Sequence, residues 1–122
     1  MLGLSFALLL MAGVLGLGLW LAFLRGPEGG APGWIAGLHG ACGALGLAVL
    51  LLAPLPAHSA VAAHGVAGFR RIGIGLLLAV LSFGIAILWW RRRARPSPLL
   101  VGGHAIGAIT ALAVLAAWFG LS

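Results

Sequence analysis

The chain has 122 residues, of which 63% are hydrophobic and only 7% are charged. A soluble domain of this length carries far more polar surface, so the composition excludes a soluble fold and predicts an integral membrane protein. The net charge of +6 comes from arginines that lie outside the apolar runs. This charge therefore indicates membrane topology and not a nucleic-acid-binding function.

Four segments are long enough to cross the membrane, since a spanning helix needs about 20 apolar residues. They are residues 2–24, 33–53, 72–90 and 99–119. No positive charge precedes the first segment and no cleavage site follows it promptly, so we interpret it as a retained helix and not as a signal peptide. Residues 1–122 are thus predicted to form a single transmembrane domain, an all-α four-helix bundle with up-down-up-down topology.

The arginines predict how the bundle is oriented. Arg25 lies in the loop after the first span, and four more arginines lie between residues 91 and 95, after the third span. The loop between the second and third spans contains Arg70 and Arg71. Because cytoplasmic loops carry the excess of positive charge, we expect the first and third loops to be cytoplasmic. Both termini then lie outside a bacterial inner membrane.

The two halves of the chain resemble each other. At an offset of 65 residues (104 − 39), His39 falls on His104 and the LAVL of residues 47–50 falls on that of 112–115. Leu24 falls on Trp89, and no gap is needed. Since the chain has only four histidines, the match predicts a duplicated helix hairpin with repeat units of about 1–57 and 66–122.

His39 and His104 lie inside the second and fourth spans. His39 is six residues past Gly33 and His104 is five past Leu99, so both lie about 8–9 Å inside the same boundary. The axes of these diagonal helices are expected to be about 12–14 Å apart. That distance is too wide for contact between the imidazoles, and it suits an iron porphyrin held between two axial histidines.

The residues around the histidines agree with this hypothesis. Small side chains would let a flat macrocycle approach the backbone; they are Gly37, Gly40 and Gly43 near His39, and Gly102, Gly103 and Gly107 near His104. Arg91 and Arg92 end the third span and are candidates to bind the heme propionates, with Arg25 behind them. A zinc site is disfavoured because Cys42, three residues from His39, has no counterpart in the second half. Cys42 is interpreted as a small packing residue.

A second candidate site lies in the loop between the second and third spans. His58 and His64 are six residues apart, which does not place them on one helical face. They could bind a second heme, or line a quinone site together with Arg70 and Arg71. The alternatives are that they belong to an interfacial loop or a short surface helix, or that this segment extends the third span as a helix, with Ser59 as a cap.

The paired histidines, with HG at residues 39–40 and GH at residues 103–104, resemble those of small bacterial four-helix b-type cytochromes. This group includes membrane anchors of redox complexes and cytochrome b561-like proteins. The resemblance implies one non-covalent heme b, with His39 and His104 as ligands of the heme iron. It also implies electron transfer between a quinone pool and other subunits of a redox complex, with any catalysis in those subunits.

Two other functions fit the same pattern. Each histidine could bind the magnesium of its own chlorophyll or bacteriochlorophyll in an accessory subunit of a photosynthetic complex. Alternatively, the chain could be a cofactor-free scaffold subunit, in which the histidines form hydrogen bonds between helices.

Overall fold

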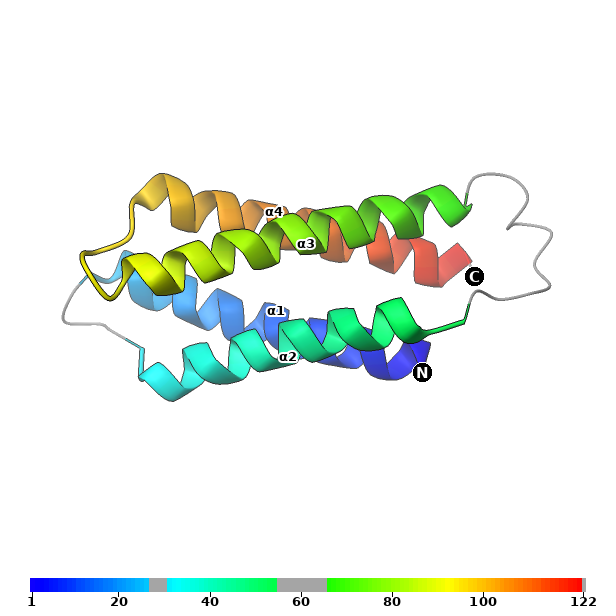
Figure 1. The fold of residues 1–122 in the computed structure, drawn as a ribbon, viewed down its shortest axis with the longest axis horizontal. Coiled ribbons are helices and arrows are strands. Elements are labelled where there is room, and N and C mark those ends of the chain that lie inside the picture. Colours follow the sequence, from blue (N-terminus) through cyan, green and yellow to red (C-terminus); the bar gives the residue numbers. More distant parts are fainter. Residues whose placement is uncertain (27–30, 55–65, 122) are drawn as a thin grey trace.

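The computed structural model describes residues 1–26, 31–54 and 66–121. Within them, α1 (Leu2–Leu24), α2 (Gly33–Leu52), α3 (Val66–Trp90) and α4 (Pro98–Leu121) form an elongated antiparallel bundle (Figure 1). All four helices are long and apolar enough to cross a membrane. The prediction of an all-α, multi-pass membrane bundle is confirmed, and the outer faces of the helices are suited to contact with lipid.

The predicted spans agree closely with α1, α2 and α4, whereas α3 is longer than predicted. It begins at Val66, six residues before the predicted start, so Arg70 and Arg71 are helical and do not lie in a loop. The apolar run ends at these arginines, but the helix continues because their long side chains can reach polar surroundings while the backbone stays helical. His58 and His64 lie outside the described residues.

The described turns carry the residues that helix ends require. Gly26 follows α1 with a φ of 88°, a left-handed conformation that glycine adopts without strain. Its N–H donates to Phe23 O at 3.2 Å. At the start of α4, Ser97 Oγ accepts a hydrogen bond from Leu100 N at 3.2 Å, and Pro98 occupies the first helical position.

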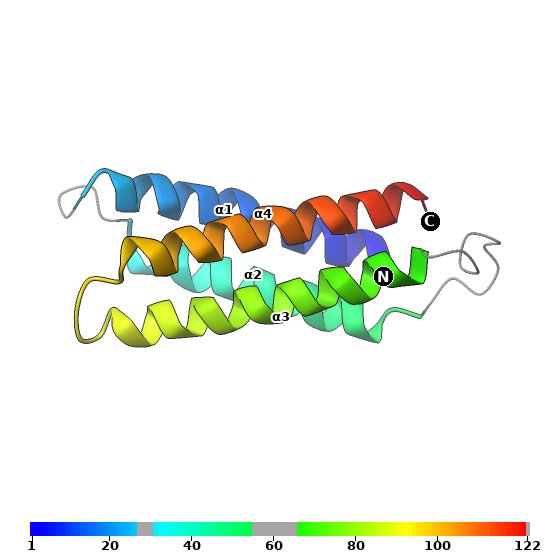
Figure 2. The same cartoon turned by 90° about the horizontal axis from the view of Figure 1, so that it is seen from above.

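The helices pack as two hairpins, α1 with α2 and α3 with α4 (Figure 1). Between the hairpins the contact is less extensive, and α1 lies beside α4 and α2 beside α3 (Figure 2). Within the first hairpin, a Cβ on Gly46 would lie 2.8 Å from Leu9 Cγ, so glycine lets the two backbones come close. Ser5 is fully buried there and donates to Gly46 O at 2.8 Å. The hairpins share an apolar core, formed by Leu9, Leu47, Leu50, Leu77, Ala111, Leu115 and Trp118.

This core occupies one half of the bundle. In the described helices, every buried residue lies at the level of the histidines or on the side of the two termini. Between the histidines and the arginine-rich turn after α3, no described helical residue is buried. A four-helix bundle ordinarily buries side chains along its whole length. The half nearer the arginines is therefore less deeply buried than the half nearer the termini.

Two arginines of the second hairpin bind carbonyl groups of the first, and we call these contacts the hairpin clasps. Arg70 donates through Nη2 to Leu50 O at 2.7 Å and to Ala53 O at 2.9 Å. At the other end of the bundle, Arg95 donates through Nη2 to Phe23 O at 3.0 Å. Each guanidinium thus lies at the C-terminal end of a helix, where carbonyls lack intrahelical partners and the helix dipole favours a cation.

Replacing Arg70 with methionine is expected to lower the free energy of unfolding by about 3 kcal/mol, because hydrogen bonds to charged groups contribute about 1.5–3 kcal/mol each. Thermal melting of the detergent-solubilised protein measures this loss. Arg71→Met is the matched control, since Arg71 is the exposed neighbour of Arg70. Equal melting temperatures for the two variants would show that the Arg70 clasp contributes nothing.

Candidate functional site

His39 on α2 and His104 on α4 meet across the bundle. Each is six residues past the start of its helix, Gly33 or Pro98, which places both about 9 Å from those helix starts. Their ring centroids are 5.8 Å apart and the ring planes are nearly perpendicular, at 76°. The expectation that the imidazoles are too far apart for contact is wrong, because both side chains extend toward each other and together bridge the gap between diagonal helices.

Both imidazoles are held by the same kind of hydrogen bond. His39 Nδ1 lies 2.8 Å from Ala12 O on α1, and His104 Nδ1 lies 2.9 Å from Val80 O on α3. A carbonyl can only accept a hydrogen bond, so Nδ1 carries the proton in each ring and donates it. In the neutral imidazole, Nε2 then keeps the lone pair that can bind a metal. Metal-ligating histidines are commonly oriented in this way.

A glycine lies against each imidazole. A Cβ on Gly16 would lie 2.9 Å from His39 Cε1, and a Cβ on Gly84 would lie 3.2 Å from His104 Cε1. Each glycine lies four residues after the residue whose carbonyl accepts the histidine hydrogen bond. The glycine and that residue are therefore on the same face of their helix. A methyl group at Gly16 would force the ring to shift, and one at Gly84 would press tightly against the ring. We call Gly16 and Gly84 the glycine seats.

The same arrangement occurs in both hairpins, but aligning the two halves of the sequence on it requires a gap. The accepting carbonyls of Ala12 and Val80 are 68 residues apart (80 − 12), as are Gly16 and Gly84 (84 − 16), whereas the histidines are 65 apart (104 − 39). An ungapped comparison would instead align Ala12 with Leu77. The expectation that the repeat needs no gap is therefore wrong, and the first hairpin has three more residues between carbonyl and histidine.

The glycines predicted from sequence have other surroundings. Gly40 and Gly103 are exposed, and nothing lies within 4 Å of a Cβ built on either. Gly43 and Gly107 face the partner helix of their own hairpin, where a Cβ would lie 3.9 Å from Ala12 Cβ and 3.0 Å from a Val80 methyl, respectively. These two glycines therefore serve helix packing next to the site.

The predicted cations are divided between the two ends of the bundle. Arg91 and Arg92 are exposed in the turn after α3, at the end nearer the histidines. Arg70 and Arg71 lie near the start of α3, at the opposite end, and Arg70 is engaged in its clasp. The described residues of the second candidate site, Arg70 and Arg71, therefore do not lie near the histidine pair.

The side chains available as metal ligands indicate which kind of metal site could form. The described residues contain no group of three or more His, Cys, Asp and Glu side chains that could hold a metal ion. Cys42 is buried. A tetrahedral zinc site made by protein ligands alone does not fit this composition. Two imidazoles from different helices do fit an iron whose remaining positions would be filled by a planar macrocycle.

The spacing of the two rings also fits this group. Metal–imidazole bonds are about 2 Å long, so two imidazoles that bind one metal ion from opposite sides have ring centres about 6 Å apart. The observed separation is 5.8 Å. The less deeply buried half of the bundle begins at the same level, so a flat group there would not displace fully buried side chains.

No protein-family model, curated protein or solved structure matches the chain. Its function is therefore inferred from the histidine pair and its surroundings.

Proposed function

We propose that the chain is a membrane electron-transfer subunit that binds one heme b through Nε2 of His39 and Nε2 of His104. The observation that carries this proposal is the matched pair of imidazoles, 5.8 Å apart, each donating through Nδ1 to a backbone carbonyl of its own hairpin. Neither hydrogen bond uses the nitrogen that would bind iron. Both rings are also supported by a glycine seat.

A heme with two imidazole ligands carries one electron at a time and has no open axial position for a substrate. This chemistry supports a role in electron transfer and not catalysis by this chain alone. The apolar helices exclude water from the site. Arg91 and Arg92, with Arg25, are the candidates to pair with the propionates, because they are exposed at the nearer end of the bundle.

The proposed orientation places the arginine-rich end in the cytoplasm of a bacterial cell and both termini outside the inner membrane. Arg25 and the arginines of residues 91–95 lie at one end, and two arginines lie near the other. The proposed partners are other subunits of a redox complex and a quinone. They would exchange electrons with the heme.

The histidine hydrogen bonds also support a second candidate, a cofactor-free scaffold. Imidazole-to-carbonyl bonds join α2 to α1 and α4 to α3, and such bonds can serve helix packing alone. The third candidate, chlorophyll or bacteriochlorophyll binding, requires a separate macrocycle for each histidine. A ring separation of 5.8 Å favours one shared macrocycle over two.

Optical spectra of the purified protein separate the three candidates. Expression in a heme-replete bacterial membrane should give a red protein with sharp visible bands after reduction with dithionite, and a pyridine hemochrome assay should give one heme b per chain. A folded but colourless protein would support the scaffold and contradict heme binding. A magnesium pigment that is extracted into acetone would support the chlorophyll alternative.

A further inference from the structure

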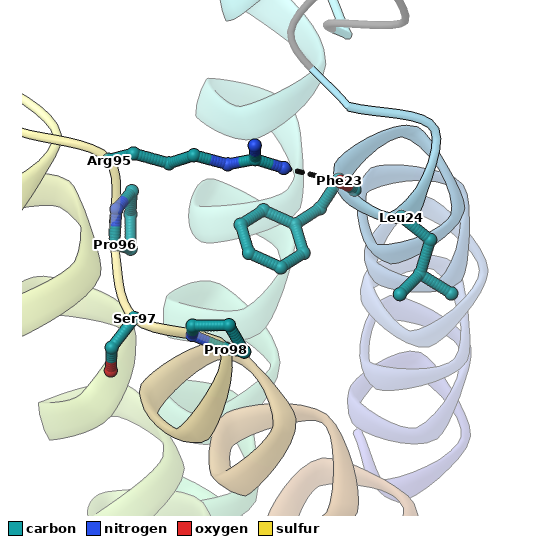
Figure 3. Close-up of a pocket in the computed structure, with 6 residues that line it drawn as sticks. All are labelled: Phe23, Leu24, Arg95, Pro96, Ser97 and Pro98. Carbon is teal, nitrogen blue, oxygen red and sulfur yellow. Dashed lines mark hydrogen bonds between the residues drawn. The ribbon is translucent and has the colours of Figure 1, made fainter.

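A cleft of about 450 Å³ lies between the end of α1 and the turn that enters α4 (Figure 3). The residues that line it are Phe23, Leu24, Arg95, Pro96, Ser97 and Pro98. Two apolar spans end here, one at Leu24 and the other at Pro98, so the cleft lies at the level where lipid headgroups meet the hydrocarbon core. Its volume is within the range of about 300–1,000 Å³ that is usual for small-molecule sites.

The lining combines a cation with apolar side chains. Arg95 extends across the cleft to Phe23, and its guanidinium lies 4.9 Å from the centre of the Phe23 ring (Figure 3). Only Nη2 is used in the bond to Phe23 O, and Arg95 is exposed. Since a guanidinium has five N–H donors, others remain available to a ligand. Leu24, 61% exposed, provides an apolar surface beside it.

The positive charge around the cleft favours an anionic ligand. Arg25 follows Leu24 directly, and Arg91, Arg92 and Arg93 precede Arg95 in the turn. The chain's one acidic residue, Glu28, follows Arg25 in the loop after α1 and lies outside the described residues, whereas five arginines belong to these two segments. Guanidinium groups bind phosphate oxygens through paired, charge-assisted hydrogen bonds, and an arginine-rich segment next to a spanning helix attracts anionic lipids.

We propose that this cleft binds the phosphate headgroup of an anionic membrane lipid, with Arg95 as its main ligand and Leu24 in contact with the acyl chain. The lipid would touch α1 of the first hairpin and the turn of the second, and would thus strengthen the Arg95 clasp. This site does not depend on heme binding, because its residues lie outside the histidine pair.

Native mass spectrometry of the full chain, released from a neutral detergent, tests the proposal. With phosphatidylglycerol added, we expect one tightly retained lipid per chain; with phosphatidylcholine or inorganic phosphate, we expect no comparable adduct. Arg95→Gln should weaken retention of phosphatidylglycerol by about tenfold or more, because a charge-assisted hydrogen bond is lost. Arg93→Gln, which removes one charge from the same turn outside the cleft lining and outside the proposed heme site, should retain the lipid.

A second variant, Leu24→Trp, fills the cleft while keeping every charge and the Phe23 carbonyl. It should also reduce lipid retention. Equal losses in Arg93→Gln and Arg95→Gln would overturn the proposal in favour of diffuse charge attraction. Equal retention of phosphatidylcholine, an adduct formed by inorganic phosphate alone, or full retention by Leu24→Trp would each overturn it as well.

Discussion

Replacing either His39 or His104 with alanine is expected to abolish heme binding while the helices still form. In the proposed site each imidazole would supply one of the two protein ligands of the iron, so the loss of affinity should exceed the roughly 10- to 100-fold effect that is typical for groups supporting a metal ligand. The two rings are only partly buried, and alanine is a good helix former. Heme titration, followed by absorbance, measures the affinity, and circular dichroism measures the helix content.

Cys42→Ala is the matched control for the histidine variants. Cys42 lies one turn beyond His39 on α2 and is the other soft donor of that helix. Its replacement should leave the heme content unchanged. Heme bound at full stoichiometry by both histidine variants would contradict the proposed ligands, and loss of heme in Cys42→Ala would point to a different ligand set.

A side chain at either glycine seat is expected to weaken heme binding strongly. In Gly16→Ala, the new methyl group would lie 2.9 Å from His39 Cε1, so the imidazole must move and its bond to Ala12 O must lengthen or break. We expect heme affinity to fall about 10- to 100-fold, the range for changes that misorient a metal ligand. Gly16→Leu should abolish binding. Heme titration of the purified variants provides the measurement.

Gly18→Ala is the control for this prediction, because nothing lies within 4 Å of a Cβ at Gly18. Alanine there should bind heme normally and stabilise α1 by up to about 1 kcal/mol through its higher helix propensity. If Gly16→Ala binds heme as tightly as the unmodified chain, the seat does not position His39. If Gly18→Ala loses heme equally, the effect belongs to α1 in general.

The spans could be predicted because the length and hydropathy of each segment follow directly from the thickness of a bilayer. Hydropathy alone could not give the start of α3, because a hydropathy pattern ends at the first charged residue, and a helical extension of this span was one of several alternatives. Helical backbone continues past that point, through Arg70 and Arg71. The clasps were also unforeseen, since they join arginines to backbone carbonyls. Every residue has such a carbonyl, so none stands out in the sequence.

The histidines could be predicted as a site because an ionisable residue in a membrane span is rare and usually functional. The glycine seats could not be predicted from the residues adjacent to the histidines in sequence. Gly40 and Gly103 are adjacent to the histidines in sequence, but consecutive residues of a helix point about 100° apart. Gly16 and Gly84 lie on the neighbouring helices, and a gapped comparison of the two halves would have aligned them.

Electron paramagnetic resonance of the oxidised, heme-loaded protein tests most directly whether His39 and His104 share one iron. If they do, the spectrum should show a single low-spin ferric species. Labelling histidine with ¹⁵N should then show that two imidazole nitrogens are coupled to the iron. The 76° angle between the rings predicts a strongly anisotropic signal, because perpendicular ligand planes leave two iron d orbitals close in energy. A high-spin signal, or coupling to one imidazole only, would contradict a shared iron.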